Sequence, residues 1–448
     1  MKKIVSVLSA MLTLAYLCFT ASVGAVEFTP PFDVNAKSVY FINLDTKSVI
    51  YEKNADLEQM PASLVNIMTA VIVLENCKDP DNITITADKK LYEEFEEYEY
   101  QDDLRYGEIW DGDELTVTDY LYAMMLTSSC EASNILAYYF GNQNISAFVE
   151  MMNAKAKEIG AEHTVFANPH GLYDSKQVTT AKDMSLITQY ALTVPGFEEI
   201  ATAEEYEVHP KSYVTAHEDP WTWTHSNIIM SAASDFYVYG VKGIKTGNLQ
   251  LSGRNIVTMG TYDGIKYLLV LLNAPFYDEN GNSKYYHIID ACNFMEWVFD
   301  NFEYKELLSE GEEIAEVKVE NSDGNGYVLV KPEEDVSTLW YNEVDVTSIQ
   351  KNIKLYDSVQ APVKKNQKLG EIELKLSDEI IANVDLVASS DIDRSFVKFN
   401  LSTAKDFFGS KWMKRAVWIS LSLLLFYLAI CICCLLYTSD AADDLIGV

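Results

Sequence analysis

The stretch QMPASLVNIMTAVIVLEN, Gln59–Asn76, places a serine directly before a long apolar run. Apolar residues follow at helical spacing from Ser63 to Glu75, which predicts a helix that begins near Ser63. A serine in this position is more often a helix cap than a nucleophile, because its hydroxyl satisfies a free backbone N–H. One turn later stands Asn66, and an amide carries no basic lone pair at neutral pH. Taken alone, the stretch predicts a buried helix with a hydroxyl at its start and no base beside it.

Strand and helix signals alternate from Phe28 to about Phe302. Strands are predicted at both ends of this region and helices between them, so we expect the terminal strands to meet around a central helical cluster. This pattern predicts one α/β domain, which we assign to residues 26–302. The expected strands are Ser38–Leu44, Val49–Glu52 and two runs joined at Asp263–Gly264, and the further helices are Val117–Leu126, Ala132–Phe140 and one that follows a cap at Thr179 or Thr180.

After Tyr304 the pattern changes to stretches in which apolar and polar residues alternate between turns. In one of them Ile372, Leu374 and Leu376 fall on the same face. This alternation predicts a small antiparallel β domain, assigned to residues 303–400. It contains no cluster of residues suited to catalysis, so a spacer or docking role is the better interpretation.

Both ends of the chain carry apolar segments. Two lysines, an apolar stretch and small residues at Val23 and Ala25 are typical of a secretory signal peptide, residues 1–25. Residues 411–437 include an uncharged run from Ala416 to Tyr437, which predicts a transmembrane anchor. The acidic residues 438–448 resemble a spurious ending of translated environmental assemblies and are set apart as a doubtful tail. We therefore expect an exported, extracytoplasmic body that a C-terminal helix anchors to the cytoplasmic membrane.

The composition excludes several classes of function. A net charge of −33 leaves no basic patch for nucleic acid. The exported body keeps only Cys77, Cys130 and Cys292, which are too scattered for a disulfide framework. The six histidines lack the spacing of metal ligands, so we expect no metal and no other cofactor. Seven acids between Glu93 and Asp103 are interpreted as a solvated loop, because the regular spacing of a calcium loop is absent.

Three short motifs follow one another along the α/β region: Ser63-Leu64-Val65-Asn66, Ser128-Ser129-Cys130 and Lys245-Thr246-Gly247. Each is weak by itself. With flanks such as DELTVTDYLYAMML, FANPHGLYDSKQVTTAKDMSLI, THSNIIM and GVKGIKTG, they resemble the serine-type D-Ala-D-Ala carboxypeptidases of peptidase family S11. These are low-molecular-weight penicillin-binding proteins whose signature is S-x-x-K, S-x-N and K-T-G. The resemblance spans roughly Val34 to Pro275, and APVKKNQKLGEIELKL is similar to the domain that follows in this family.

The resemblance implies a fold and a reaction. The fold is the penicillin-binding-protein/β-lactamase type, an antiparallel sheet with a helical cluster, followed here by the β domain and the transmembrane helix. Ser63 would attack the penultimate D-Ala of a peptidoglycan stem peptide that ends in D-Ala-D-Ala, and β-lactams would bind the same site. Ser128 would relay a proton to the leaving amine. The terminal carboxylate would bind the K-T-G strand at Lys245, Thr246, Gly247 and Asn248, with the N–H groups of Ser63 and Asn248 as an oxyanion hole.

Two departures from the signature fall on catalytic positions. Asn66 stands in place of the lysine base and Cys130 in place of the asparagine. Losing a general base costs roughly 10²–10⁴-fold in rate. Lys245 is an alternative base on the opposite wall, whereas Cys130 is either a small buried residue or a nucleophile without an adjacent base.

Three hypotheses stay open. The first is a weakly active D,D-carboxypeptidase. The second is an inactive relative that binds peptidoglycan or acts as a scaffold. The third is a class A β-lactamase, against which the β domain and the anchor argue.

Overall fold

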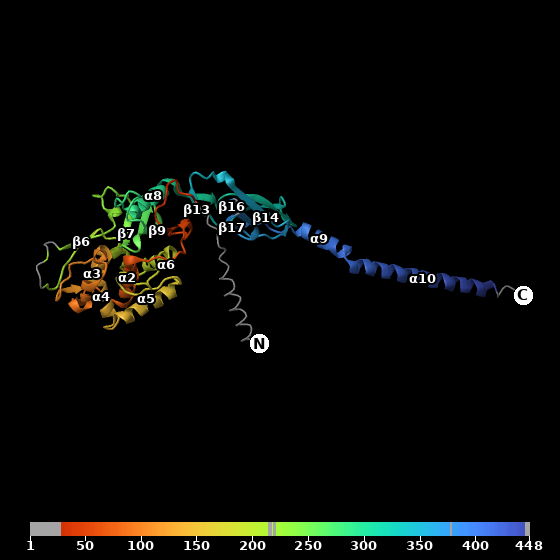
Figure 1. Cartoon of the computed structure of the whole chain (residues 1–448). Helices are drawn as coiled ribbons and strands as arrows, with labels where there is room; N and C mark the ends of the chain where they lie inside the picture. The colour runs from red at the N-terminus through yellow and green to blue at the C-terminus, as the bar shows by residue number, and fades with distance from the viewer. Residues whose placement is uncertain (1–27, 214–216, 218–220, 377–378, 444–448) are drawn as a thin grey trace. The chain divides into compact units, whose positions relative to one another are not determined.

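The computed structural model describes residues 28–213, 217, 221–376 and 379–443 (Figure 1). The predicted signal peptide, residues 1–25, lies outside the described residues. The chain divides into two compact units, and each is described by itself. The larger unit runs to Tyr304 and also takes in Leu339–Val344, and the smaller one holds most of the chain after Tyr304.

A five-stranded antiparallel sheet forms the centre of the larger unit. Its order is β2-β1-β9-β8-β7, so β1 of the N-terminal region pairs with β9 near the end of the domain, as predicted. β8 and β9 are joined at Asp263 and Gly264, whose φ angles of 49° and 79° are those of a tight hairpin turn. The strands are β1 (Ser38–Asn43), β2 (Val49–Lys53), β7 (Val241–Leu249), β8 (Gly253–Tyr262) and β9 (Ile265–Ala274).

Successive side chains on each strand point to opposite faces of the sheet, and both faces are covered by helices. Leu269 and Leu271 of β9 pack with α8 (Tyr286–Asn301), whereas Leu268 and Val270 pack into the helical cluster. α2 (Val65–Asn76) lies among the other helices of that cluster (Figure 1), and its residues 65–73 are all buried. The surrounding helices are α3 (Val117–Thr127), α4 (Cys130–Phe140), α5 (Ile145–Ile159) and α6 (Ala181–Ala191).

Side-chain caps fix where these helices begin. The hydroxyls of Thr116, Ser129 and Thr180 accept a backbone N–H at the start of α3, α4 and α6. Thr180 is therefore the cap of α6, and Thr179 is not. The shorter elements of the unit are η1 (Ala62–Leu64), β3 (Thr84–Thr86), η2 (Lys89–Leu91), η3 (Glu93–Glu97), η4 (Gln101–Asp103), β4 (Glu114–Thr116), α7 (Phe197–Ala201), β5 (Glu205–Glu207), β6 (Thr222–Thr224) and η5 (Ile228–Met230).

The region after Tyr304 is built from strands, as the alternation predicted. Six of them form a sheet in the order β14-β16-β17-β12-β11-β15, while β10 pairs with β13. Ile372 and Leu374 are buried on one face of β16, and Leu376 is half-buried at its end. The elements are β10 (Phe302–Leu308), β11 (Ala315–Glu320), β12 (Tyr327–Pro332), β13 (Val336–Tyr341), η6 (Val346–Ser348), β14 (Ile349–Leu355), β15 (Val359–Gln360), β16 (Lys368–Leu376) and β17 (Glu379–Ala388).

Two helices come after the β sheet. α9 (Phe396–Gly409) was not predicted from the sequence, and its first residues, 396–400, fall within the stretch assigned to the β domain. Its start is set by Ser395, whose hydroxyl accepts the N–H of Lys398. In α10 (Lys411–Asp443), residues Lys411–Cys434 are long and apolar enough to cross a membrane, by length and composition alone. The predicted span, 411–437, covers this segment, and α10 continues into the residues set apart as a tail.

Candidate active site

The three motifs come together beside strand β7. The Lys245 ammonium donates a hydrogen bond to the Ser128 hydroxyl across 2.5 Å. A side-chain carbon added to Gly247 would lie only 3.0 Å from the backbone nitrogen of Ser63, so this glycine lets β7 run against η1. Cys130 and Ala62 share one buried apolar cluster with Leu249 of β7. The structure therefore gathers the predicted site residues at one place.

Ser63 is held at the start of the helix without acting as a cap. It lies in the 3₁₀ turn η1, two residues before α2 begins, and no side chain caps either element. Ala62 before it adopts a left-handed φ of 51°, and Gly171 packs so closely on the Ala62 carbonyl that a side-chain carbon would lie 2.2 Å from its oxygen. The half-buried Ser63 hydroxyl has no hydrogen bond within the described part of the chain. The helix-cap interpretation is therefore wrong, and the hydroxyl is unengaged.

Asn66 is turned into the protein interior. Its side chain is fully buried, and its amide nitrogen donates to the Ser133 hydroxyl and to the Pro169 carbonyl, both at 3.1 Å. Its amide oxygen is buried without a partner among the residues that the structure describes. Asn66 therefore links α2 to α4 and to the loop at Pro169, and it makes no hydrogen bond with Ser63.

Lys245 is a buried amine without a carboxylate partner among the described residues. Besides Ser128, it donates to the backbone carbonyl of Thr246 at 3.1 Å. Burial lowers the pKa of Lys245 to about 7. At neutral pH a substantial fraction of Lys245 is therefore the free base, which is the form that can accept a proton.

The second motif sits at the junction of two helices. Ser128 ends α3 with a left-handed φ of 65°, and Ser129 caps α4. The Cys130 thiol is buried, and its one hydrogen bond is a long contact of 3.9 Å to the Ser128 carbonyl. Burial raises the pKa of Cys130 to about 12, so the thiol is protonated at neutral pH. Cys130 thus fits the interpretation of a small buried residue better than that of a nucleophile.

The third motif presents a hydroxyl beside the lysine. Thr246 Oγ1 lies 2.6 Å from the hydroxyl of Ser226, a residue of the segment just before η5. Ser226 belongs to the THSN segment, which carries part of the family resemblance but suggested no role for this serine. The Asn248 side-chain oxygen is buried without a partner at the end of the motif. Ser226 is the residue that sequence reasoning missed here.

Glu131, next to Cys130, is a second residue that the sequence did not single out. It is buried, one carboxylate oxygen accepts the N–H of Gly107 at 2.6 Å, and the other has no partner within the described part of the chain. Burial raises the pKa of Glu131 to about 7, against the hydrogen bonds that favour the charged form. The carboxyl ties the segment before β4 to the start of α4.

We expect Glu131→Gln to stabilise the protein in a pH-dependent way. Because the folded pKa lies above the ordinary value of 4.5, the folded state binds more protons between pH 4.5 and 7, and its stability falls as the pH rises through that window. Glutamine lacks this loss, so the variant should match the wild type at pH 4 and exceed it by about 1–3 kcal/mol at pH 8. Urea unfolding at both pH values measures the difference, and a pH-independent difference would contradict the assignment.

No group of three or more His, Cys, Asp or Glu side chains within the described residues is placed to hold a metal ion. The acidic residues of 93–103 are thus not gathered into such a cluster. They lie in η3, η4 and the turns around them, close to the three motifs.

The fold resembles those of several solved structures of penicillin-binding proteins. The fold matches the whole of penicillin-binding protein 5 from Haemophilus influenzae, over 82% of this chain, with a TM-score of 0.57 at 22% identity. It also matches all of the Streptomyces K15 DD-transpeptidase, over 61% of this chain, with a TM-score of 0.52 at 23% identity. At these identities the likeness establishes the fold.

The chain belongs to the D-alanyl-D-alanine carboxypeptidase family, peptidase family S11, whose model matches residues 25–276. The C-terminal domain of penicillin-binding protein 5 matches residues 302–394. Among relatives, the carboxypeptidase DacF of Bacillus subtilis is 26% identical over 413 residues, which are 91% of this chain and 99% of DacF. DacA of Haemophilus influenzae is 24% identical over 390 residues, 84% of this chain and 91% of DacA. The predicted family and fold are confirmed.

Proposed function

We propose that this protein is a slow D-Ala-D-Ala carboxypeptidase of peptidoglycan stem peptides, with Ser63 as the nucleophile. The hydrogen bond between Lys245 and Ser128 is the observation that carries the proposal. Through this bond, Ser128 contacts a buried amine with a lowered pKa. The amine belongs to β7, the strand that runs against the backbone of Ser63. The names of the related carboxypeptidases support the substrate class.

The reaction needs one proton acceptor and one proton donor. Ser63 Oγ bonds to the carbonyl carbon of the penultimate D-Ala, and its proton passes to the Ser128–Lys245 pair. The same pair returns the proton to the amine of the terminal D-Ala as the C–N bond breaks. Water then hydrolyses the acyl-serine. Asn66 takes no part, since its amide is engaged with Ser133 and Pro169.

Binding of the substrate carboxylate assists this transfer. The carboxylate of the terminal D-Ala would meet Thr246 and Lys245, two buried residues of β7. An approaching negative charge raises the pKa of a neighbouring amine, so it favours the protonated form of Lys245 once the proton has left Ser63. One residue thereby serves both steps, but less well than two separate lysines would, so we expect slow turnover.

We expect a fluorescent penicillin to label the purified protein slowly and only through Ser63. Labelling should vanish in Ser63→Ala, because the acyl bond forms on that hydroxyl. Gel fluorescence over a time course measures the rate. A wild type that takes no label over hours would instead favour an inactive, peptidoglycan-binding relative, and label that persists in Ser63→Ala would refute the choice of nucleophile.

The labelling rate should also rise with pH through about 7. Lys245 must be neutral to accept the proton, and its lowered pKa places that transition near neutrality in the free protein, which is the state that the rate at low penicillin concentration reports. A rate that stays flat between pH 6 and 8 would exclude Lys245 as the acceptor.

An exported, membrane-attached location is part of the proposal. The apolar helix Lys411–Cys434 supports attachment by length and composition. Carbonate extraction of membranes from cells that make the full chain tests it: the protein should stay in the pellet, and a chain that ends at Ser410 should be released.

A further inference from the structure

Residues 92–104, here called the acidic strap, cross the site that the proposed function assigns. The strap contains η3 and η4 and carries seven acids from Glu93 to Asp103. Its Phe95 is 1% exposed and packs in one cluster with Ala62, Cys130 and Leu249, each of which belongs to one of the three motifs or lies within two residues of it. The apolar side of the strap therefore faces the catalytic residues, while most of its acids are exposed.

Asn134 of α4 donates a hydrogen bond to Glu94 of the strap at 3.0 Å, and two other hydrogen bonds fasten the strap to opposite walls of the site. On one side, the Tyr98 hydroxyl accepts the N–H of Tyr173 at 3.0 Å. On the other, an Asp103 carboxylate oxygen accepts the N–H of Gln250, directly after β7, at 3.0 Å. Phe95 adds an edge-to-face contact with His170, with ring centres 5.1 Å apart. The strap thus bridges the loop before α6 and the end of the K-T-G strand.

Three of the side chains that a stem peptide must reach are covered in this arrangement, whereas Ser63 itself is half-buried. Lys245, Thr246 and Ser128 are 0%, 3% and 6% exposed. A peptide carboxylate cannot contact side chains so deeply buried unless a neighbouring segment moves. The strap is a candidate for this movement, because one of its attachments is incomplete: the second Asp103 oxygen is buried without a partner among the described residues.

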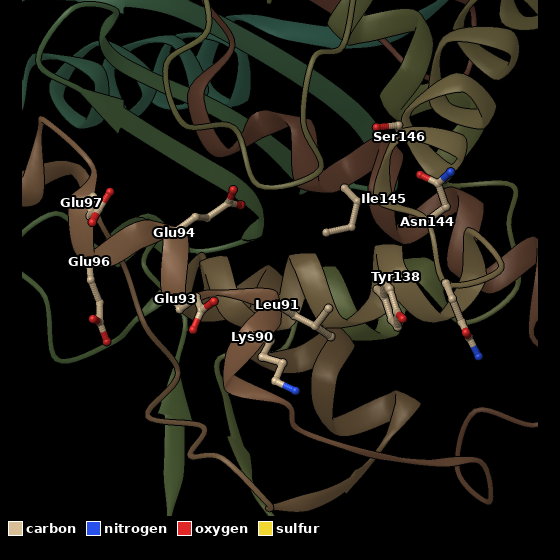
Figure 2. A pocket seen from close by; sticks show the side chains of 11 residues that line it. Lys90, Leu91, Glu93, Glu94, Glu96, Glu97, Tyr138, Asn144, Ile145 and Ser146 are labelled. Atoms are coloured by element: carbon tan, nitrogen blue, oxygen red, sulfur yellow. The ribbon is translucent and has the colours of Figure 1, made fainter.

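The outer side of the strap has room for such a movement. A hollow lies between Lys90–Glu97 and the start of α5 at Asn144, Ile145 and Ser146 (Figure 2). In this view Glu94 points from the strap toward the hollow, and Ile145 lies on its far side. A second hollow, lined by Phe95, Tyr98 and His170, shares Glu94, Ile145 and Ser146 with the first.

We propose that the acidic strap closes the Ser63 site in the resting protein and swings outward, toward α5, to admit the peptide. The inference rests on the proposed function for the identity of the site, but its closure can be tested without any catalysis. Cys130 is 2% exposed and belongs to the same buried cluster as Phe95, so the reactivity of its thiol reports how often the strap opens.

The test compares alkylation of the full-length protein by N-ethylmaleimide, mapped by mass spectrometry. We expect Phe95→Ala to speed alkylation of Cys130 about tenfold, since it removes the buried ring that holds the strap. Tyr98→Phe removes one hydrogen bond and should speed it about threefold. Glu99→Gln, an exposed change on the same strap, should have no effect. Cys77, buried at the end of α2, is the internal control for global unfolding and should react at an unchanged rate.

The possible outcomes distinguish a failure of the strap proposal from a failure of the carboxypeptidase proposal. If Cys130 reacts no faster in either strap variant, or if Cys77 accelerates in parallel, closure by the strap is refuted. If Cys130 alone accelerates and penicillin labels Ser63 faster in the same variants, both proposals stand. If Cys130 alone accelerates and penicillin labels no variant, the strap stands and the carboxypeptidase proposal falls.

Discussion

The double variant Asn66→Lys, Cys130→Asn should acylate with fluorescent penicillin at least about 100-fold faster than the wild type. The interior around Asn66 already offers two acceptors for an amine, the Pro169 carbonyl and the Ser133 hydroxyl. A lysine there restores a base one turn from Ser63. An asparagine at position 130 replaces a thiol whose one hydrogen bond is a contact of 3.9 Å to the Ser128 carbonyl.

A matched control separates the base from the packing. Asn66→Met, Cys130→Asn places a side chain of similar length at position 66 but supplies no amine, so it should stay at the wild-type rate or below it. Both variants enlarge a buried side chain and are expected to lose about 1–3 kcal/mol of stability. The measurement is repeated with Tyr98→Phe added, so that closure by the strap does not hide the gain. Equal acylation rates for the lysine and methionine variants in both backgrounds would mean that residues outside the three motifs also prevent acylation.

The fold could be predicted from local patterns because each pattern recurs in the packing. Successive residues of the strands pack into the clusters on the two faces of the sheet, and the apolar run after Ser63 forms a helix that is buried in the helical cluster. The pairing of β1 with β9 followed from strands at both ends of one domain. The helical start at Phe396 was missed because the preceding alternation carries no sign of where the strands end.

The site was only partly predictable, since its chemistry depends on contacts between distant segments. The motifs named Ser63, Ser128 and Lys245, but no local pattern around Lys245 indicates that its amine is wholly buried. The acidic residues of 93–103 were likewise predicted to form a solvated loop. The acids are mostly exposed, yet one of them, Asp103, and the aromatic Phe95 in the same stretch are buried against the site. The available sequence signal was an aromatic residue, Phe95, inside a run of acids, which indicates that one side of the segment packs against the protein.

Lys245→Met should abolish penicillin acylation and, below pH 7, stabilise the fold. The loss of rate should exceed about 100-fold, because no other amine is hydrogen-bonded to Ser128 among the described residues. The gain in stability follows from the lowered pKa. The unfolded chain binds more protons between pH 7 and 10.5, so the wild type becomes more stable as the pH rises through that window and carries the full cost of the buried charge below it.

The two effects on stability oppose each other, and pH decides which one dominates. Burying the charged amine costs about 2–5 kcal/mol at pH 6, while methionine leaves the Thr246 carbonyl and the Ser128 hydroxyl without their donor, at about 1–3 kcal/mol. Lys245→Met should therefore be the more stable protein at pH 6 and the less stable one near pH 10, as measured by urea unfolding. Lys242→Met, an exposed lysine on the same strand, is the matched control and should show no such reversal. A Lys245→Met variant that is less stable at both pH values would show that the amine holds the site together, and its function as a proton acceptor would lose its physical basis.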